Sequence, residues 1–360
     1  MIKASAPGKL YIAGEYAVLE PGHPAILVAL NQYITVKLTQ TNNLGTIRSS
    51  LTNGFPIPWT RKQGKFFMDQ RENPFAYVVE AVTTTEKYLS ELNKPLHFFN
   101  LEIESDLDNH DGRKYGLGSS GAVTVATIKA LLKFYHVPFT SETLYKLAAI
   151  THLAINSNGS FGDLAASSFG GWIAYSCFDR EWLMNKISEH SLSELLEMDW
   201  PLLNIEPLQV PNNLELLIGW TGTPASTTHL VDLINDEKAE IRECYTHFLA
   251  ESKTVVEKML EGFKEQEIKT IQTGIKQNRQ LLQQLGKSSG IQIETSTLFE
   301  MCEIAEEYGG AAKSSGAGGG DCGIVIIEKR PTYTPLFTEW LGKNITPLPL
   351  LVHYDYVKQV

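Results

Sequence analysis

Hydrophobic residues recur along this chain with two different spacings, and each spacing predicts one kind of secondary structure. Residues 97–105 (HFFNLEIES) alternate between apolar and polar positions, as a strand with one buried face does. Residues 76–92 and 141–155 carry apolar residues three and four positions apart, which predicts amphipathic helices. Residues 122–135 have the same helical spacing, and this helix is expected to end near Pro138.

Polar stretches and continuous apolar runs complete the pattern. Residues 42–75 are polar with scattered Gly and Pro, which predicts hairpins or a loop. Residues 226–285 predict two or three long helices, and residues 298–309 predict a further helix that Gly309 ends. Runs rich in β-branched and aromatic residues predict strands within residues 10–19, 25–38, 172–178, 214–222 and 323–329.

The order of the predicted elements indicates the fold class and a division into two domains. Strands and helices are mixed without the regular alternation that builds a parallel sheet, so the predicted class is α+β. A region containing Pro and Trp follows the strand at residues 172–178 and extends to residue 211. We place the domain boundary there, which gives an N-terminal domain of residues 1–185 and a C-terminal domain of residues 186–360.

The composition is that of a globular protein, with 43% hydrophobic and 20% charged residues among 360. The net charge of −10 argues against a nucleic-acid partner, because phosphate backbones need a cationic surface. The first residues lack a signal-peptide pattern, and no apolar run approaches the roughly 18 residues of a membrane span. We therefore expect a cytoplasmic protein. Its four cysteines form no C-x-x-C pair and are expected to be free thiols, with Cys322 a small buried residue.

Residues 115–122 (YGLGSSGA) are compatible with three kinds of chemistry. Gly116, Gly118 and Gly121 fit the dinucleotide-binding pattern G-x-G-x-x-G. Gly118, Ser120 and Ala122 differ by one methyl group from the nucleophile elbow G-x-S-x-G of hydrolases. Both of these patterns need a buried strand directly before the first glycine. The nearest predicted strand ends near residue 105 and a polar segment intervenes, so we disfavour both interpretations.

A phosphate-binding loop is the third interpretation and the one that the context favours. Glycines let several backbone N–H groups converge on one anion, and a helix beginning at about Ser119 directs its positive end toward the same anion. Ser119 and Ser120 are candidates to bind a phosphate oxygen or Mg²⁺, with helix capping as the alternative role. Arg113 and Lys114 add positive charge at the rim, unless they belong only to a solvated loop. The loop lacks the Walker A frame.

Two further segments contain residues that are suited to binding a phosphorylated ligand. In APGKLYIAGEYAVL (residues 6–19), Lys9 follows a Pro-Gly turn, although a surface lysine at a strand end would explain it equally well. In KSSGAGGGDCG (residues 313–323), the glycines favour close approach of the backbone to a ligand. A mobile linker is the alternative for this loop, but the apolar strand that follows favours a packed site.

Together the three segments resemble the signature motifs of the GHMP small-molecule kinases, in the family's order. Mevalonate kinases tend to have GEH in the first motif and GAGGGGC in the third. This chain has Gly14-Glu15-Tyr16 and Gly320-Asp321-Cys322, and it is most similar to the phosphomevalonate kinase branch. The segments GWTGTPAS (residues 219–226) and GDLA (residues 162–165) support the same branch. The resemblance implies two α+β domains with ATP and substrate in the cleft between them.

The resemblance also implies roles in catalysis. Lys9 is expected to neutralise charge on the transferring phosphoryl group, and Asp163 matches the acidic catalytic residue of mevalonate kinases. A helix N-cap remains the alternative role for Asp163. The acceptor would be a phosphate, which is largely ionised near neutral pH because its second pKa is about 6. A strong general base is then unnecessary, so we predict that Asp163 mainly orients Lys9, while Lys9 and Mg²⁺ supply electrostatic stabilisation.

Binding roles are implied in the same way. Asn278 and Arg279 lie within a predicted helix and could reach the cleft from it, but an exposed helix face is the preferred interpretation. The residues expected to hold ATP are Lys114, Gly116, Leu117, Gly118, Ser119, Ser120 and Gly121, with Ser120 nearest Mg²⁺. The residues expected to contact the acceptor are Tyr16, Ser157, Ser160, Ser226, Ser315, Gly316, Ala317 and Gly318.

The function that the resemblance implies is ATP- and Mg²⁺-dependent phosphorylation of 5-phosphomevalonate to the diphosphate, in the mevalonate route to isopentenyl diphosphate. A mevalonate kinase, another small-molecule kinase of the family, or the related diphosphomevalonate decarboxylase is the nearest alternative. A catalytically silent ligand-binding regulator is an alternative from a different class. The presence of Lys9, Ser120 and Asp163 argues against that last possibility.

Overall fold

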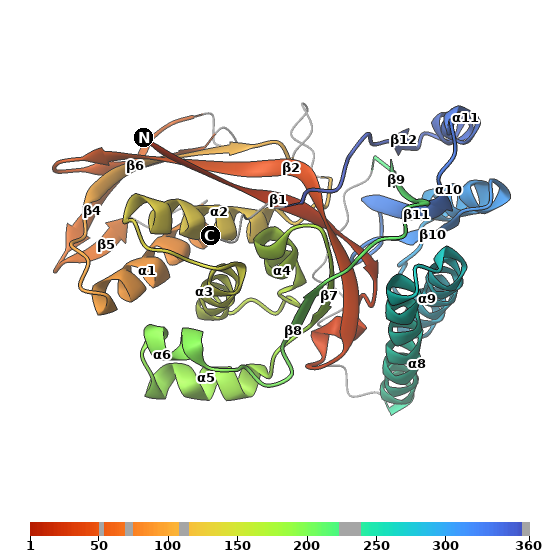
Figure 1. The fold of residues 1–360 in the computed structure, drawn as a ribbon, viewed down its shortest axis with the longest axis horizontal. Coiled ribbons are helices and arrows are strands. Elements are labelled where there is room, and N and C mark those ends of the chain that lie inside the picture. The colour runs from red at the N-terminus through yellow and green to blue at the C-terminus, as the bar shows by residue number, and fades with distance from the viewer. Residues whose placement is uncertain (50–53, 69–74, 108–114, 223–238, 355–360) are drawn as a thin grey trace.

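A long strand, β2 (Pro24–Thr41), organises the larger of two sheets in this computed structural model (Figure 1). β1 (Ile2–Ala13) runs antiparallel along one edge of β2, while β6 and β7 share its other edge. The eight-stranded sheet has the order β5-β4-β3-β6-β2-β7-β8, with β1 beside β2. The structure describes residues 1–49, 54–68, 75–107, 115–222 and 239–354. The remaining strands of this sheet are β3 (Gly45–Ser49), β4 (Ile57–Lys62), β5 (Lys65–Met68), β6 (Phe98–Ser105), β7 (Trp172–Ser176) and β8 (Asn204–Pro207).

Helices cover one face of this sheet, as Figure 1 shows. α2 and α4 pack directly on β1 and β2, and α1 and α3 pack against α2. The helical spacing at residues 76–92, 122–135 and 141–155 correctly predicted α1, α2 and α3. These helices bury the apolar stripes that the spacing identified. The bounds are α1 (Ala76–Glu91), α2 (Ser119–Phe134), α3 (Ser141–Ala154), α4 (Gly162–Phe169), α5 (Arg180–Glu189) and α6 (Leu192–Glu197).

The second part of the molecule is built on a four-stranded sheet with the order β10-β11-β9-β12. α9 and α10 pack against β10 and β11, while α8 pairs with α9. The predicted stop at Gly309 is confirmed, because Gly309 has a φ of 79° and Gly310 N–H returns to Ala305 O at 2.9 Å. The elements are β9 (Leu214–Trp220), β10 (Ala311–Ser314), β11 (Cys322–Glu328), β12 (Thr346–Pro347), α8 (Ala239–Lys264), α9 (Ile268–Ser289), α10 (Ser296–Glu307) and α11 (Thr334–Gly342).

One expectation about chain organisation needs correction. The strand expected within residues 10–19 ends at Ala13, because Gly14 has a φ of 88° and a short 3₁₀ helix, η1 (Ala17–Leu19), follows. The division into two domains remains a prediction, and its expected boundary between residues 185 and 186 falls within α5. β8 then continues the larger sheet by pairing with β7, so we propose that the two parts of the chain meet between β8 and β9.

The chain also returns to the larger sheet near its end. Leu30 and Val352 form an isolated bridge, and His353 N–H donates to Ala29 O at 2.9 Å. Residues 351–353 therefore pair with the first part of the molecule, although the predicted boundary assigns them to the second domain. None of the helices in the described residues is long and apolar enough to cross a membrane.

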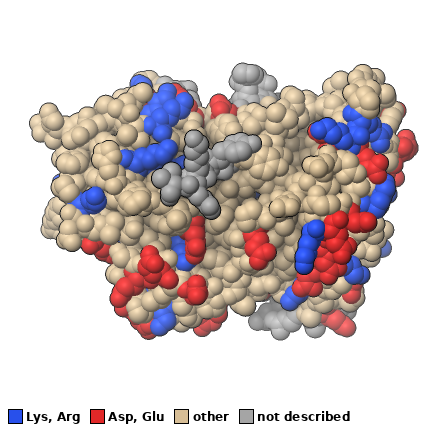
Figure 2. Space-filling view, viewed as in Figure 1, with Lys and Arg blue, Asp and Glu red and all other residues tan. Residues whose placement is uncertain are grey.

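The distribution of charged side chains on the surface is consistent with the net charge of −10. In Figure 2, Asp and Glu gather over the lower part of the face, around α5, α6, α8 and α9, and Lys and Arg lie in separate smaller groups. The described residues on this face therefore do not form the continuous basic stripe that a nucleic-acid backbone needs.

Candidate active site

Lys9 lies at the point where β1 leaves its regular pairing with β2. The register shifts between Pro7 and Gly8, and the buried Ser167 hydroxyl of α4 donates to Pro7 O at 2.7 Å. Lys9 N–H donates to Leu117 O at 2.8 Å, and Lys9 Nζ lies 3.4 Å from Gly116 O. The side chain is only 9% exposed, so Lys9 is not the surface lysine that a strand end alone would explain.

The surroundings of Lys9 set its charge state through two opposing effects. Burial lowers the pKa of the Lys9 ammonium, because a charged group loses solvation. The negative charges of Asp163 and then Asp321 act in the opposite direction and raise this pKa. Lys9 also lies over the ring of Tyr11, with Nζ 5.2 Å from the ring centre.

The glycine loop has the backbone geometry that glycine supplies. Gly116 and Gly118 have φ values of 73° and 77°, and Gly118 is the N-cap of α2. The space beside the glycines is occupied by charged side chains. A Cβ atom on Gly118 would lie 2.9 Å from Lys9 Cε, and one on Gly121 would lie 2.5 Å from Asp163 Oδ2. Lys9 and Asp163 therefore lie beside the start of α2, whose unpaired N–H groups are suited to bind an anion.

Gly118→Ala is expected to weaken ATP binding by about tenfold or more, since the methyl group would displace Lys9 and the left-handed backbone would cost about 1–2 kcal/mol. The KM for ATP in a coupled assay measures this effect. Gly64→Ala is the matched control, because Gly64 has a φ of 78° and nothing lies within 4 Å of its added Cβ. An equal KM in the two variants would contradict the assignment of this loop to ATP.

Asp163 lies in the first turn of α4 and is not its N-cap. The N-cap is Phe161, which has a φ of 59°, and Asp163 Oδ1 accepts a hydrogen bond from Leu164 N–H at 3.0 Å. Lys9 and Asp163 approach the same point over Gly118, at 2.9 Å and 3.3 Å from the position of a Cβ atom there. Among the described residues, Lys9 and Asp163 do not form an ion pair with each other. That Asp163 orients Lys9 remains a prediction.

The first turn of α2 is supported from behind by α1 and α3. Thr124 Oγ1 donates to Ser120 O at 2.9 Å and lies 3.0 Å from His152 Nε2. Burial lowers the pKa of His152 and raises that of Tyr77, and the charge of Asp163 raises both. The Ser120 side chain also acts on Tyr77 of α1, where it lowers the pKa of the hydroxyl. His152 and Tyr77 were not identified from sequence, because a histidine or tyrosine on a helix face has no distinguishing pattern.

Two of the residues predicted to contact the acceptor, Ser160 and Ser315, converge on Tyr11, which sequence reasoning also missed. The Ser160 and Tyr11 hydroxyls form a hydrogen bond. Ser315 Oγ accepts from Tyr11 N–H and donates to Tyr11 O, both at 2.9 Å, so its side chain attaches the third glycine loop to β1. Tyr16 OH donates to Ala317 O in the same loop, and burial raises the pKa of Tyr16.

The other predicted residues lie nearby or outside the described residues. Ser157 Oγ accepts from Gly159 N–H at 3.4 Å in the turn before α4. Gly316 and Gly318 have positive φ values of 74° and 71°, which glycine adopts without the steric cost of a side chain. Lys114 and Ser226 lie outside the described residues.

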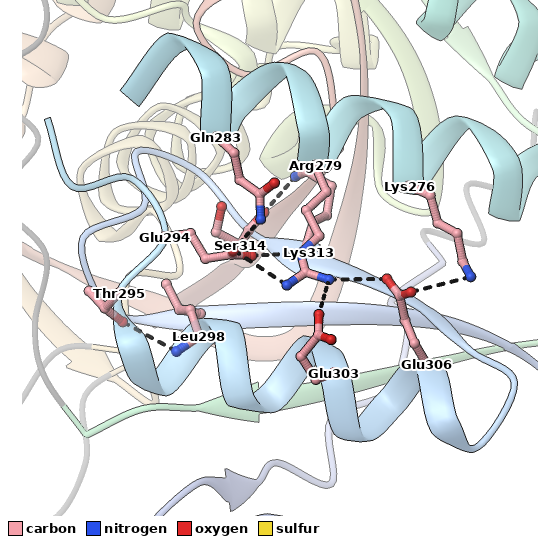
Figure 3. A network of polar contacts seen from close by, with 10 residues as sticks. All are labelled: Lys276, Arg279, Gln283, Glu294, Thr295, Leu298, Glu303, Glu306, Lys313 and Ser314. Atoms are coloured by element: carbon pink, nitrogen blue, oxygen red, sulfur yellow. Dashed lines mark hydrogen bonds and ion pairs between the residues drawn. The ribbon is translucent and has the colours of Figure 1, made fainter. Parts of the chain in front are cut away.

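The expectation that Asn278 and Arg279 lie on an exposed helix face is wrong. Asn278 is fully buried and the Arg279 side chain is 8% exposed. Figure 3 shows the reason for Arg279, which extends from α9 toward carboxylates on α10 and on the segment before it. Its Nε lies 2.7 Å from Glu294 Oε1, and Nη1 lies 2.9 Å from Glu303 Oε1 and 3.1 Å from Glu306 Oε1.

This network supports the third glycine loop from outside. Glu294 follows Ile293, whose carbonyl accepts from Gly319 N–H at 2.8 Å. A Cβ atom on Gly318 would lie 2.3 Å from the same carbonyl oxygen, so the loop packs tightly on this segment. On the inner side, the fully buried Lys313 forms an ion pair with Glu15, which connects β10 to the segment after β1. The three glycine-containing segments are thus held as one unit.

Known proteins are similar to this chain in both sequence and fold. Family models for the GHMP kinases N terminal domain and the GHMP kinases C terminal match residues 76–171 and 259–332. The phosphomevalonate kinase of Streptomyces sp. (strain CL190) is 35% identical over 357 residues, covering 96% of this chain and 95% of that protein. The mevalonate kinase of Thermococcus sibiricus is 28% identical, covering 91% of this chain and 90% of that protein.

Two solved structures are similar over nearly the whole chain. The phosphomevalonate kinase of Streptococcus pneumoniae, in complex with phosphomevalonate and AMPPNP, has a TM-score of 0.84 and 30% identity, with 98% of this chain and 100% of that chain covered. The Lin0012 protein of Listeria innocua has a TM-score of 0.91 and 38% identity, with 98% of each chain covered.

The fold, the glycine loop and Lys9 at its edge define a small-molecule kinase, and this chain belongs to the GHMP kinase family. Within that family it is more similar to the Streptomyces phosphomevalonate kinase, at 35% identity, than to the Thermococcus mevalonate kinase, at 28%. The predicted α+β class and the resemblance to this family are therefore confirmed.

Proposed function

We propose that this protein transfers the γ-phosphoryl group of ATP to 5-phosphomevalonate, in the mevalonate route to isopentenyl diphosphate. A phosphate oxygen of the acceptor attacks the γ-phosphorus, the bond from that phosphorus to the β–γ bridging oxygen breaks, and ADP leaves. The observation that carries the proposal is the convergence of Lys9 and Asp163 on Gly118, at the N-terminus of α2. Because ATP is the phosphoryl donor, we place this reaction in the cytoplasm, where that nucleotide is abundant.

The charges around Gly118 explain why Lys9 and Asp163 have different roles in the proposed reaction. Two anions must approach each other during the transfer, so the site has to supply positive charge. The Lys9 ammonium and the N–H groups of the first turn of α2 supply it near Gly118. Asp163 holds Lys9 in this position and accepts no proton, because the acceptor phosphate, with a second pKa of about 6, is already ionised near neutral pH.

The residues present fit a magnesium ion. Mg²⁺ prefers oxygen ligands and is usually held by one or two protein groups together with substrate phosphates. The Ser120 hydroxyl, in the first turn of α2, is such a donor. We propose that Ser120 would hold Mg²⁺ together with the ATP phosphates, whose charge the ion would neutralise.

An acceptor assay tests the proposed function directly. ADP release is measured with mevalonate, phosphomevalonate and diphosphomevalonate in separate reactions, and only phosphomevalonate is expected to support turnover. ADP release with mevalonate would identify a mevalonate kinase, and carbon dioxide release from diphosphomevalonate would identify the decarboxylase. No ADP with any acceptor would favour a silent ligand-binding protein.

A further inference from the structure

Tyr11 of β1 contacts two groups of the site that the sequence identified separately. Its ring lies under Lys9, with Nζ 5.2 Å from the ring centre. Its hydroxyl forms a hydrogen bond with the Ser160 hydroxyl, in the turn before α4. Tyr11 is 7% exposed, so both contacts are made inside the protein. One buried side chain therefore links the proposed catalytic lysine to a residue that is expected to bind the acceptor.

The turn that carries Ser160 needs support from its surroundings. Phe161, the next residue, has a φ of 59°, and a non-glycine residue in this conformation costs of order 1–3 kcal/mol. α4 begins at Gly162, directly after this residue, and Asp163 is its second residue. The positions of Ser160 and Asp163 therefore both depend on the conformation of this one turn.

Two tyrosine hydroxyls support the turn. The Tyr175 hydroxyl donates to Ser160 O at 2.7 Å and lies 2.9 Å from the Tyr145 hydroxyl. The Tyr11 hydroxyl binds the Ser160 side chain, and a Cβ atom on Gly162 would lie 2.3 Å from Tyr11 Oη. Tyr175 thus holds the backbone of Ser160, while Tyr11 holds its side chain and packs on the first residue of α4.

Tyr11 is itself held in place through its backbone. It pairs with Leu27 in the regular part of β2. Ser315 Oγ accepts from Tyr11 N–H and donates to Tyr11 O, both at 2.9 Å. A residue that is anchored in this way gives its side-chain partner a fixed position, as a supporting residue behind a binding group must do.

We propose that the Tyr11 hydroxyl is a positioning group, which directs the Ser160 hydroxyl and the start of α4 toward the phosphate acceptor. This inference rests on the proposed function, in which Ser160 contacts phosphomevalonate. Without the Tyr11 hydroxyl, the partner that remains for Ser160 Oγ among the described residues is Gly162 N–H, at 3.3 Å. The Ser160 hydroxyl then adopts other orientations, and binding of the acceptor is weakened.

Tyr11→Phe removes the hydroxyl and keeps a ring under Lys9. The KM for phosphomevalonate is expected to rise about three- to tenfold, the usual effect of one lost hydrogen bond, while the KM for ATP is unchanged. Tyr145→Phe is the matched control, because the Tyr145 hydroxyl is equally buried and binds Tyr175 instead of Ser160. A parental KM for phosphomevalonate in Tyr11→Phe, or an equal rise in both KM values, would overturn the proposal.

A double variant shows whether Tyr11 acts through the serine. Ser160→Ala alone is expected to raise the KM for phosphomevalonate at least as much as Tyr11→Phe does. The variant with both substitutions is expected to have the same KM as Ser160→Ala, since the Tyr11 hydroxyl no longer has a group to direct. Multiplication of the two single effects would show that Tyr11 acts independently of Ser160 and would contradict the proposal.

Hydrogen exchange followed by mass spectrometry tests the support of the turn without relying on activity. The amides of residues 160–164 are expected to exchange about three- to tenfold faster in Tyr11→Phe than in the parent protein and in Tyr145→Phe. Unchanged exchange would count against the proposal. Failure of the proposed function is a separate result, recorded as absence of phosphomevalonate-dependent ADP release by the parent protein, and the exchange rates still decide whether Tyr11 holds the turn.

Discussion

Lys9→Ala is expected to lower kcat with phosphomevalonate by about 10²–10³-fold, the usual loss when one preorganised electrostatic contact to a transition state is removed. The reason is the position of Lys9, whose Nζ approaches Gly116 O and whose Cε lies beside Gly118, at the start of α2 where we propose that the phosphates bind. The KM values are expected to change much less, because the charge on the transferring group is neutralised most in the transition state.

Steady-state kinetics at saturating ATP and phosphomevalonate measure this effect. Lys3→Ala is the matched control, since Lys3 lies on the same strand and is exposed. A near-normal kcat in Lys9→Ala would remove Lys9 from the mechanism. Asp163→Ala and the double variant extend the test. If Asp163 acts by orienting Lys9, the double variant loses no more activity than Lys9→Ala alone.

Arg279→Met is expected to lower the free energy of unfolding by about 3 kcal/mol, as removal of one member of a buried ion pair commonly does. Arg279 and Glu294 have side-chain exposures of 8% and 9%, so the substitution leaves the Glu294 carboxylate buried beside a methionine. Glu303 is 50% exposed and can be solvated instead, so its contact adds little. Urea unfolding followed by circular dichroism measures the change.

Lys276→Met is the matched control for this prediction. Lys276 lies on the same helix, is 48% exposed, and pairs with Glu306, so its loss is expected to cost less than about 1 kcal/mol. Equal stability of the two variants would show that the network in Figure 3 does not stabilise the protein. We also expect Arg279→Met to raise the KM for phosphomevalonate, because Glu294 follows Ile293, which holds the third glycine loop through Gly319.

Local patterns in the sequence were sufficient to predict the features that depend on local physics. α1, α2 and α3 follow the spacing of apolar residues, since a helix buries one stripe wherever its partner lies. Glycines at positions 116, 118, 316 and 318 marked the loops correctly, because a positive φ is a requirement of the backbone at each position itself.

Two short helices carry a local start signal that the spacing of apolar residues does not reveal. α6 begins with a capping box, in which Ser191 accepts from Glu194 N–H and the Glu194 side chain accepts from Ser191 N–H. α5 begins with Asp179, whose side chain accepts from Trp182 N–H. Both helices lie in the region that was interpreted as a boundary because of its Pro and Trp content.

The sequence by itself determined the α+β class, the three glycine-containing segments and the family to which they belong. Only the tertiary structure decided what surrounds them: Tyr11 bonded to Ser160 and Ser315, Arg279 buried among carboxylates, and Asp321 packed on Gly116. The tertiary structure also decided that the end of the chain returns to the larger sheet, where His353 N–H donates to Ala29 O. The physical reason is that backbone conformation and amphipathicity are encoded within a few neighbouring residues, whereas the charge and burial of Lys9 depend on residues more than a hundred positions away.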